Sequence, residues 1–265
     1  MRAMNGVWTR SVHLKLVLCV ICLIVALPSI VDASLPIPTL EVPVIWKKTG
    51  EIVTAGWCAN DQKWVYVETG ELSSRTRHLL HDDLRRAGWR SITIQTDTLN
   101  DMDFWDELLR LDIFGIISLD DLSFSGFKTK ATLGSWQLVA FVGEADSDRG
   151  DTYDYLAILN HEPNLRANLD GVLPTHCHPV PGSQLVQAYI PINQPITRGF
   201  YRFRTAQPMD TVVDHYARLP GWATYSLGVW GTFGGSEAAG LFLYIEPPLA
   251  KAGIVSYTIG SEHVF

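Results

Sequence analysis

The sequence predicts an α+β protein of two related β-α-β-β units, each a mainly antiparallel sheet packed on one helix, with insertions in the first unit. The main observation is a faint internal repeat. Trp64–Thr69 and Phe200–Thr205 are both aromatic-rich alternating runs that end in Thr. Such alternation is typical of half-buried strands. A helix-like stretch, a Gly-Trp pair and a further alternating run follow each copy.

The Gly-Trp pairs, Gly88-Trp89 and Gly221-Trp222, each follow an expected helix. Glycine readily adopts the left-handed conformation that closes a helix at its C-terminus. The large ring of the next residue can then fold beneath the helix and onto the sheet. The sequence therefore predicts that both Trp side chains belong to the core, with stacking on a ligand as the alternative.

The first unit begins with a proline-rich, extended lead-in at residues 34–47. Its first strand is expected at Trp64–Glu68. Ser73 or Ser74 can cap a helix that runs to about Ala87. The elements expected after this helix are strand Ser91–Thr96, helix Asn100–Leu109, strands Ile113–Leu119, Ser123–Thr129 and Ser135–Val142, and the acidic loop Glu144–Asp154.

The second unit follows a connector at Asn160–Pro174 and has the same order of elements. Its helix is expected at Met209–Leu219, because Pro208 is tolerated in a first helical turn and Gly221 ends the pattern. The expected strands are Gln184–Ile190, Phe200–Arg204, Ala223–Trp230, Ala239–Glu246 and Ile254–Ile259, with a turn at Gly234-Gly235.

The N-terminus has the layout of a secretory signal peptide. Arg2, Arg10 and Lys15 precede an apolar run at residues 16–31, and Ala33 is suitable for cleavage. The run contains Pro28 and is shorter than the roughly 20 residues of a spanning helix, so an uncleaved anchor is the alternative. The expected organisation is a signal peptide at 1–33, a first unit at 34–165 and a second unit at 166–265.

The charge of the chain excludes some partners. The formal net charge is −7, and the sequence contains no basic cluster that would favour nucleic acid or an anionic membrane surface. We expect an exported protein, periplasmic or extracellular, that meets the membrane only transiently through its signal peptide or as an uncleaved anchor. No sequence motif implies a cofactor.

Two cysteines, Cys58 and Cys177, would remain after cleavage. In an oxidising compartment an isolated pair is most simply a disulfide, and this one would join the two halves of the chain. Two buried free thiols are the alternative. The sequence therefore predicts a disulfide as the first interpretation.

His176 and His178 flank Cys177 in the densest group of reactive side chains. Two His could ligate a soft or borderline metal ion, or could assist a thiolate nucleophile. Both roles need a reduced cysteine, and a bridging loop with solvated His is the competing interpretation.

Other candidate sites have weaker signals. His78 and His81 are three residues apart and share a helix face, so with Asp82 they could form part of a zinc site. No third ligand follows at a characteristic distance, and a solvated helix face is the favoured interpretation. The acidic loop at residues 146–151 lacks the spacing of a calcium loop. Trp230 precedes a glycine-rich stretch and is the best candidate for an exposed, ligand-binding aromatic residue.

These observations favour a non-catalytic protein-binding or adaptor protein of the cell envelope or secreted fraction, whose partner is another protein. No nucleophile elbow, phosphate-binding loop or zinc-protease motif is present in the sequence. One alternative is a metal-assisted hydrolase that uses His176 and His178 or carboxylates of the acidic loops. The other is an inhibitor that neutralises a secreted toxin.

Overall fold

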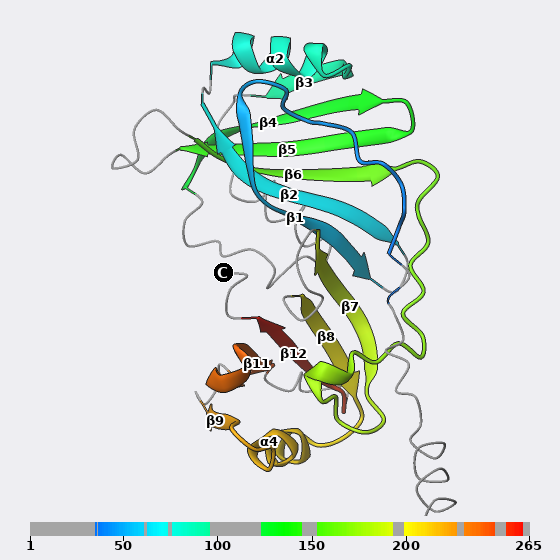
Figure 1. Cartoon of the computed structure of the whole chain (residues 1–265), viewed down its shortest axis with the longest axis vertical. Helices are drawn as coiled ribbons and strands as arrows, with labels where there is room; N and C mark the ends of the chain where they lie inside the picture. Colours follow the sequence, from blue (N-terminus) through cyan, green and yellow to red (C-terminus); the bar gives the residue numbers. More distant parts are fainter. Residues whose placement is uncertain are drawn as a thin grey trace, which may run out of the picture. The chain divides into compact units, whose positions relative to one another are not determined.

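A computed structural model describes residues 35, 37–60, 63–73, 76–95, 123–144, 153–192, 199–226, 231–246 and 253–261. The first half contains six strands and the α-helix α2 (Arg77–Arg86) (Figure 1). Its strands are β1 (Gly50–Asn60), β2 (Trp64–Leu72), β3 (Arg90–Gln95), β4 (Ser123–Leu133), β5 (Trp136–Glu144) and β6 (Tyr153–His161).

The strands and the α-helix of the second half follow the same order as those of the first half. A short 3-10 helix, η1 (Thr175–Cys177), comes first, and the α-helix α4 (Met209–Ala217) lies between the second and third strands. The elements around them are β7 (Gln184–Pro191), β8 (Phe200–Thr205), β9 (Ala223–Ser226), β10 (Thr232–Ser236), the 3-10 helix η4 (Glu237–Ala239), β11 (Leu241–Ile245) and β12 (Val255–Ser261).

All twelve strands belong to one sheet with the order β3-β4-β5-β6-β2-β1-β7-β8-β12-β11-β10-β9. Every neighbouring pair is antiparallel. The two halves meet where β1 pairs with β7, with Trp57 opposite Ile190. Read outward from this junction, the halves have the same strand order, and the edge strands β3 and β9 occupy corresponding positions.

The predicted fold class is therefore wrong. The described residues form a single twelve-stranded antiparallel sheet with two α-helices, and not two β-α-β-β units in which separate sheets pack on a helix. Two central strands were missing from the prediction. β1 contains two glycines and lacks a clean alternation, and β6 contains the continuous apolar run Tyr155–Leu159, which is buried on both faces of the sheet.

The remaining elements follow the sequence more closely. Gly234 and Gly235, expected in a turn, lie inside β10, and the strand expected at Ala223–Trp230 is described only as far as Ser226. The helix at Asn100–Leu109, the strand at Ile113–Leu119 and the signal peptide lie outside the described residues. Residues Leu35–Phe265 form one compact unit, and the boundary between residues 165 and 166 stays a prediction.

Helix α2 ends in a Schellman motif. Trp89 N–H donates to the carbonyl of Leu84 at 3.0 Å, and Gly88 N–H donates to that of Arg85 at 3.0 Å. Gly88 has a φ of 97°, which a residue with a Cβ rarely adopts. The motif turns the chain so that the Trp89 side chain is fully buried, which confirms the core prediction for this residue.

The hydrophobic core contains side chains from both helices and both halves of the sheet. Leu80 and Leu84, one turn apart on α2, are fully buried, as are Val212 and Tyr216 on α4. Trp222 is only partly buried, with its ring centroid 5.0 Å from that of Tyr216. Both helices therefore pack on the face of the sheet that carries the core, and α2 lies beside the edge strand β3 (Figure 1).

Candidate functional site

A groove of about 820 Å³ lies between the first half of α2 and the edge strand β3. The helix supplies one wall, and the strand supplies the other through Ile92, Thr93 and Ile94. Ile92 and Ile94 give this wall an apolar surface, and Thr93, between them, is exposed. The volume is within the range that ligand sites of proteins occupy. The helix residues of the groove are Thr76, Arg77, His78 and His81.

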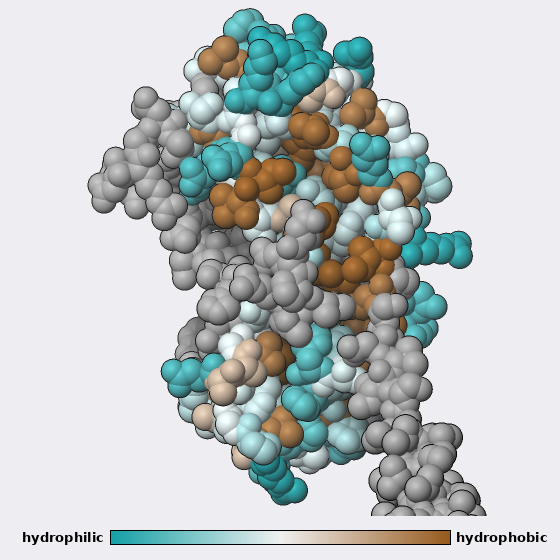
Figure 2. All heavy atoms as spheres, viewed as in Figure 1, coloured by the Kyte–Doolittle hydropathy of each residue, from teal (hydrophilic) through white to brown (hydrophobic). Residues whose placement is uncertain are grey.

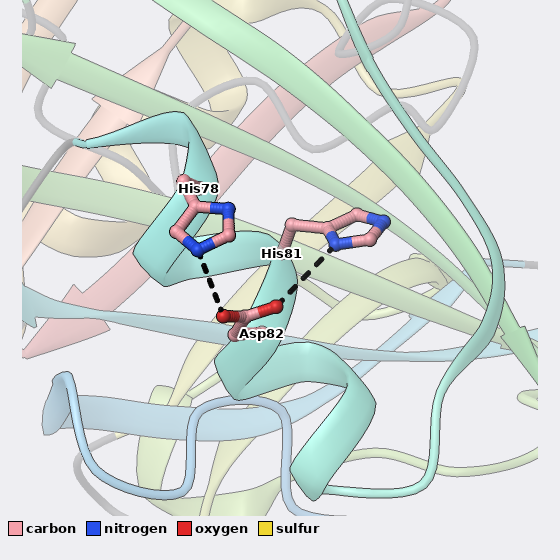
Figure 3. A network of polar contacts seen from close by, with 3 residues as sticks. All are labelled: His78, His81 and Asp82. Atoms are coloured by element: carbon pink, nitrogen blue, oxygen red, sulfur yellow. Dashed lines mark ion pairs between the residues drawn. The ribbon is translucent and has the colours of Figure 1, made fainter.

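Two imidazole rings on the helix wall share one carboxylate (Figure 3). His78 Nε2 lies 3.2 Å from Asp82 Oδ2, and His81 Nδ1 lies 3.9 Å from Asp82 Oδ1. The spacing of four residues places the His78 ring beside Asp82 on the same helix, whereas the ring of His81, the preceding residue, lies farther from the carboxylate. The second nitrogen of each ring points away from the carboxylate (Figure 3).

The strand wall of the groove is an edge of the sheet. β3 pairs with β4 on one side, and no other described strand pairs with it on the opposite side. The register shifts between Arg90 and Thr93, and Ser91 has a φ of 50°. An edge strand presents backbone N–H and C=O groups to which a further strand can be added.

Asp83 fixes the helix wall. Its buried carboxylate accepts hydrogen bonds from the backbone N–H groups of Lys47, Lys48 and Thr49 at 3.0–3.1 Å and from the Thr49 hydroxyl at 2.7 Å. Burial opposes ionisation, but these hydrogen bonds outweigh it and lower the pKa of Asp83. The carboxylate therefore holds α2 to the segment that precedes β1.

The predicted metal ligands do not form a cluster. The His176 ring packs edge-on against Tyr201, with centroids 5.2 Å apart. His178 is exposed in a left-handed conformation, and its carbonyl lies 2.9 Å from His215 Nε2. Within the described ranges, no group of three His, Cys, Asp or Glu residues is placed to hold a metal ion, and this applies also to His78, His81 and Asp82.

Cys58 and Cys177 are both free thiols, so the predicted disulfide is not formed in the structure. Cys177 belongs to the main core cluster, as do Trp57 and Ala59, the neighbours of Cys58 in β1, whereas Cys58 itself does not. Successive side chains of a strand point to opposite faces, so the sheet lies between the two thiols. Burial raises the pKa of both cysteines.

A buried carboxyl group lies elsewhere in the first half. Glu68 on β2 accepts hydrogen bonds from Tyr66 Oη at 3.1 Å and from Tyr155 Oη, on β6, at 2.5 Å. Its neighbours across the sheet are Ala55 and Ala157, so the carboxyl group sits between small side chains. Burial raises the pKa of Glu68, and the two tyrosine hydrogen bonds only partly oppose this shift.

The raised pKa of Glu68 predicts a pH dependence of stability. The folded protein binds the carboxyl proton more tightly than the unfolded chain does. The resulting stabilisation is complete below the unfolded pKa of about 4.3 and is lost as pH rises through the folded pKa. Urea unfolding of the parent and of Glu68→Gln between acid and neutral pH should show the parent losing stability relative to the variant. If the parent instead gained stability relative to Glu68→Gln as the pH rises, the raised pKa of Glu68 would be contradicted.

Sequence reasoning found only part of this site. His78, His81 and Asp82 were noted for their helical spacing, but the groove depends on β3 being an edge strand, which no local pattern reveals. Glu68 alternates with apolar residues in β2 and therefore resembles a solvent-facing residue; only the burial of both faces of β2 shows otherwise. Trp230, the predicted binding residue, lies outside the described residues.

Comparison of the chain with models of protein families, with curated proteins and with solved structures gives no match. The fold and the groove therefore define the class: an antiparallel β-sheet protein with a helix-walled groove at one sheet edge. In the part of the chain that the structure describes, no helix has the length and apolar character needed to cross a membrane.

Proposed function

We propose that the protein binds an extended segment of a partner protein, which adds as a strand to β3 in the groove beside α2. The observation that carries this proposal is the groove itself, of about 820 Å³, between a helix and an edge strand. Peptides bind to such edges through backbone hydrogen bonds, while alternate side chains enter the neighbouring surface and give specificity.

The chemistry of the groove supports a peptide ligand. Ile92 supplies apolar surface, and Thr93, His78 and His81 supply polar groups along the same groove. A peptide in strand conformation directs every second side chain into the groove, where apolar and polar contacts alternate. The helix wall is held in place by Asp83 and Trp89, so the groove forms without the ligand and less ordering is needed on binding.

The cellular setting is part of the proposal. Export through the N-terminal segment would place this groove in the periplasm or outside the cell, where the partner would be an envelope or secreted protein. An inhibitor of a secreted toxin would use the same edge, with a strand of the toxin as its ligand. No arrangement among the described residues favours the hydrolase alternative.

Peptides that alternate Val with Glu, Ser or Lys, about ten residues long, test the proposal by fluorescence anisotropy. We expect at least one to bind the parent protein. Thr93→Trp, which fills the groove from an exposed position, should weaken this binding by about tenfold or more, equivalent to about 1.4 kcal/mol. Ala223→Trp, exposed on the opposite edge strand β9, is the matched control and should leave binding unchanged.

Backbone pairing is tested separately with the same peptides. A version N-methylated at every second residue keeps its side chains but loses the donors of one strand edge, so it should not bind. Strand addition at β3 is contradicted if no unmethylated peptide binds, if Thr93→Trp leaves binding intact, or if N-methylation has no effect.

A further inference from the structure

The described elements around the groove are basic, although the protein as a whole is acidic. The whole sequence has a formal net charge of −7. The described residues of α2, β3 and β4, together with the turn between α2 and β3, contain six basic side chains and only two acidic ones, a net charge of +4 with His neutral. We call these three elements the basic edge. Its basic residues are Arg77, Arg85, Arg86, Arg90, Lys128 and Lys130.

Both carboxylates of the basic edge are already engaged. Asp83 is buried and is bound by backbone N–H groups of the lead-in segment. Asp82 lies between His78 and His81. Arg77, by contrast, is exposed and lines the groove together with the two imidazole rings. Figure 2 shows the hydrophilic residues gathered over α2, at the top of the view.

We infer that the segment bound in the groove is acidic, with Asp or Glu side chains at alternate positions that face Arg77, His78 and His81. This inference rests on the proposed function, because it names the chemical class of the segment that adds to β3. Complementary charges raise the rate at which the segment meets the groove, and they fix its register along β3, more than they increase its affinity.

A second polyanion class, single-stranded nucleic acid, is the competing occupant. It is less favoured, because nucleic-acid binding needs a basic surface that extends along several phosphates, and the chain as a whole is acidic. The apolar strand wall at Ile92 and the edge of β3, with which no described strand pairs, suit a polypeptide instead. Displacement of the bound peptide by oligo(dT) would identify this competitor.

The three alternating peptides test the charge class. The Val-Glu peptide should bind more tightly than the Val-Ser peptide, and the Val-Lys peptide should bind least. Affinity for Val-Glu should fall as salt is raised, since exposed ion pairs are screened. Arg77→Glu should weaken Val-Glu binding by about fivefold. Arg218→Glu, an identical charge change at the exposed C-cap residue of α4, should not.

The outcomes separate this inference from the proposed function. If Val-Ser or Val-Lys binds as well as Val-Glu and Thr93→Trp still blocks it, strand addition stands and the acidic class is wrong. If Arg77→Glu and Arg218→Glu weaken binding equally, the effect is one of net charge, and the groove assignment is wrong. If oligo(dT) displaces Val-Glu and binds more tightly, the acidic-peptide assignment is overturned. Absence of binding by all three peptides overturns both proposals.

Discussion

Replacing Trp89 with Ala should lower the free energy of unfolding by about 3–5 kcal/mol. The Trp89 ring is fully buried in the cluster that contains Leu80 and Leu84, so truncation leaves a large cavity beneath α2. Its Nε1 also donates a hydrogen bond to the carbonyl of Val44 at 2.9 Å, and this acceptor would lose its partner. Urea unfolding followed by circular dichroism measures the change.

Trp222→Ala is the matched control, since each Trp directly follows a glycine with positive φ in the turn after a helix. Trp222 is only partly buried against Tyr216, so its loss should cost clearly less than the loss of Trp89. The account of the two Gly-Trp pairs is contradicted if the two variants unfold at the same urea concentration, or if Trp89→Ala unfolds like the parent.

Replacing Asp83 with Asn should cost about 2–4 kcal/mol, because hydrogen bonds to a buried charged group contribute more than neutral ones. An amide can accept only through one oxygen, and its NH₂ group would face the N–H groups of Lys47, Lys48 and Thr49. The segment before β1 would then lose its attachment to α2. Asp82→Asn, at the neighbouring and partly exposed carboxylate, should change stability little.

The lowered pKa of Asp83 fixes the pH dependence of this effect. Because the folded state holds the carboxyl proton less tightly than the unfolded chain, the stabilisation is present above the unfolded pKa of about 3.9 and lost as pH falls through the folded pKa. The stability difference between the parent and Asp83→Asn should therefore narrow below about pH 4. A difference that widens in acid would show that the carboxylate does not hold the segment.

The local features of the fold were predictable from sequence. Helix α4 ends at Ala217 with Arg218 as its C-cap, so the predicted stop at Gly221 is wrong. The two helices, the glycine stop of α2 and the burial of Trp89 do follow from apolar spacing and from the left-handed preference of glycine. These sequence signals span only one or two turns of a helix. They remain correct whichever sheet the helices pack on.

The sheet as a whole was not predictable in this way. β6 pairs with β2 and β5, and β1 pairs with β2 and β7, so both strands lie in the interior of the sheet. β6 is buried on both faces along Tyr155–Leu159, and neither strand shows the alternation that identifies a strand. The single sheet depends on these pairings between distant segments. The groove exists because β3 is the last strand at its end of the strand order. Cys58 and Cys177 lie on opposite faces of the sheet because of the position of β1.

Amide hydrogen exchange tests the central claim, strand addition at β3, most directly. Binding of the Val-Glu peptide should slow exchange within Arg90–Gln95, since added backbone hydrogen bonds protect edge amides, and should leave Ala223–Ser226 on the opposite edge unchanged. Equal protection of both edges, or protection confined to regions other than β3, would contradict the claim.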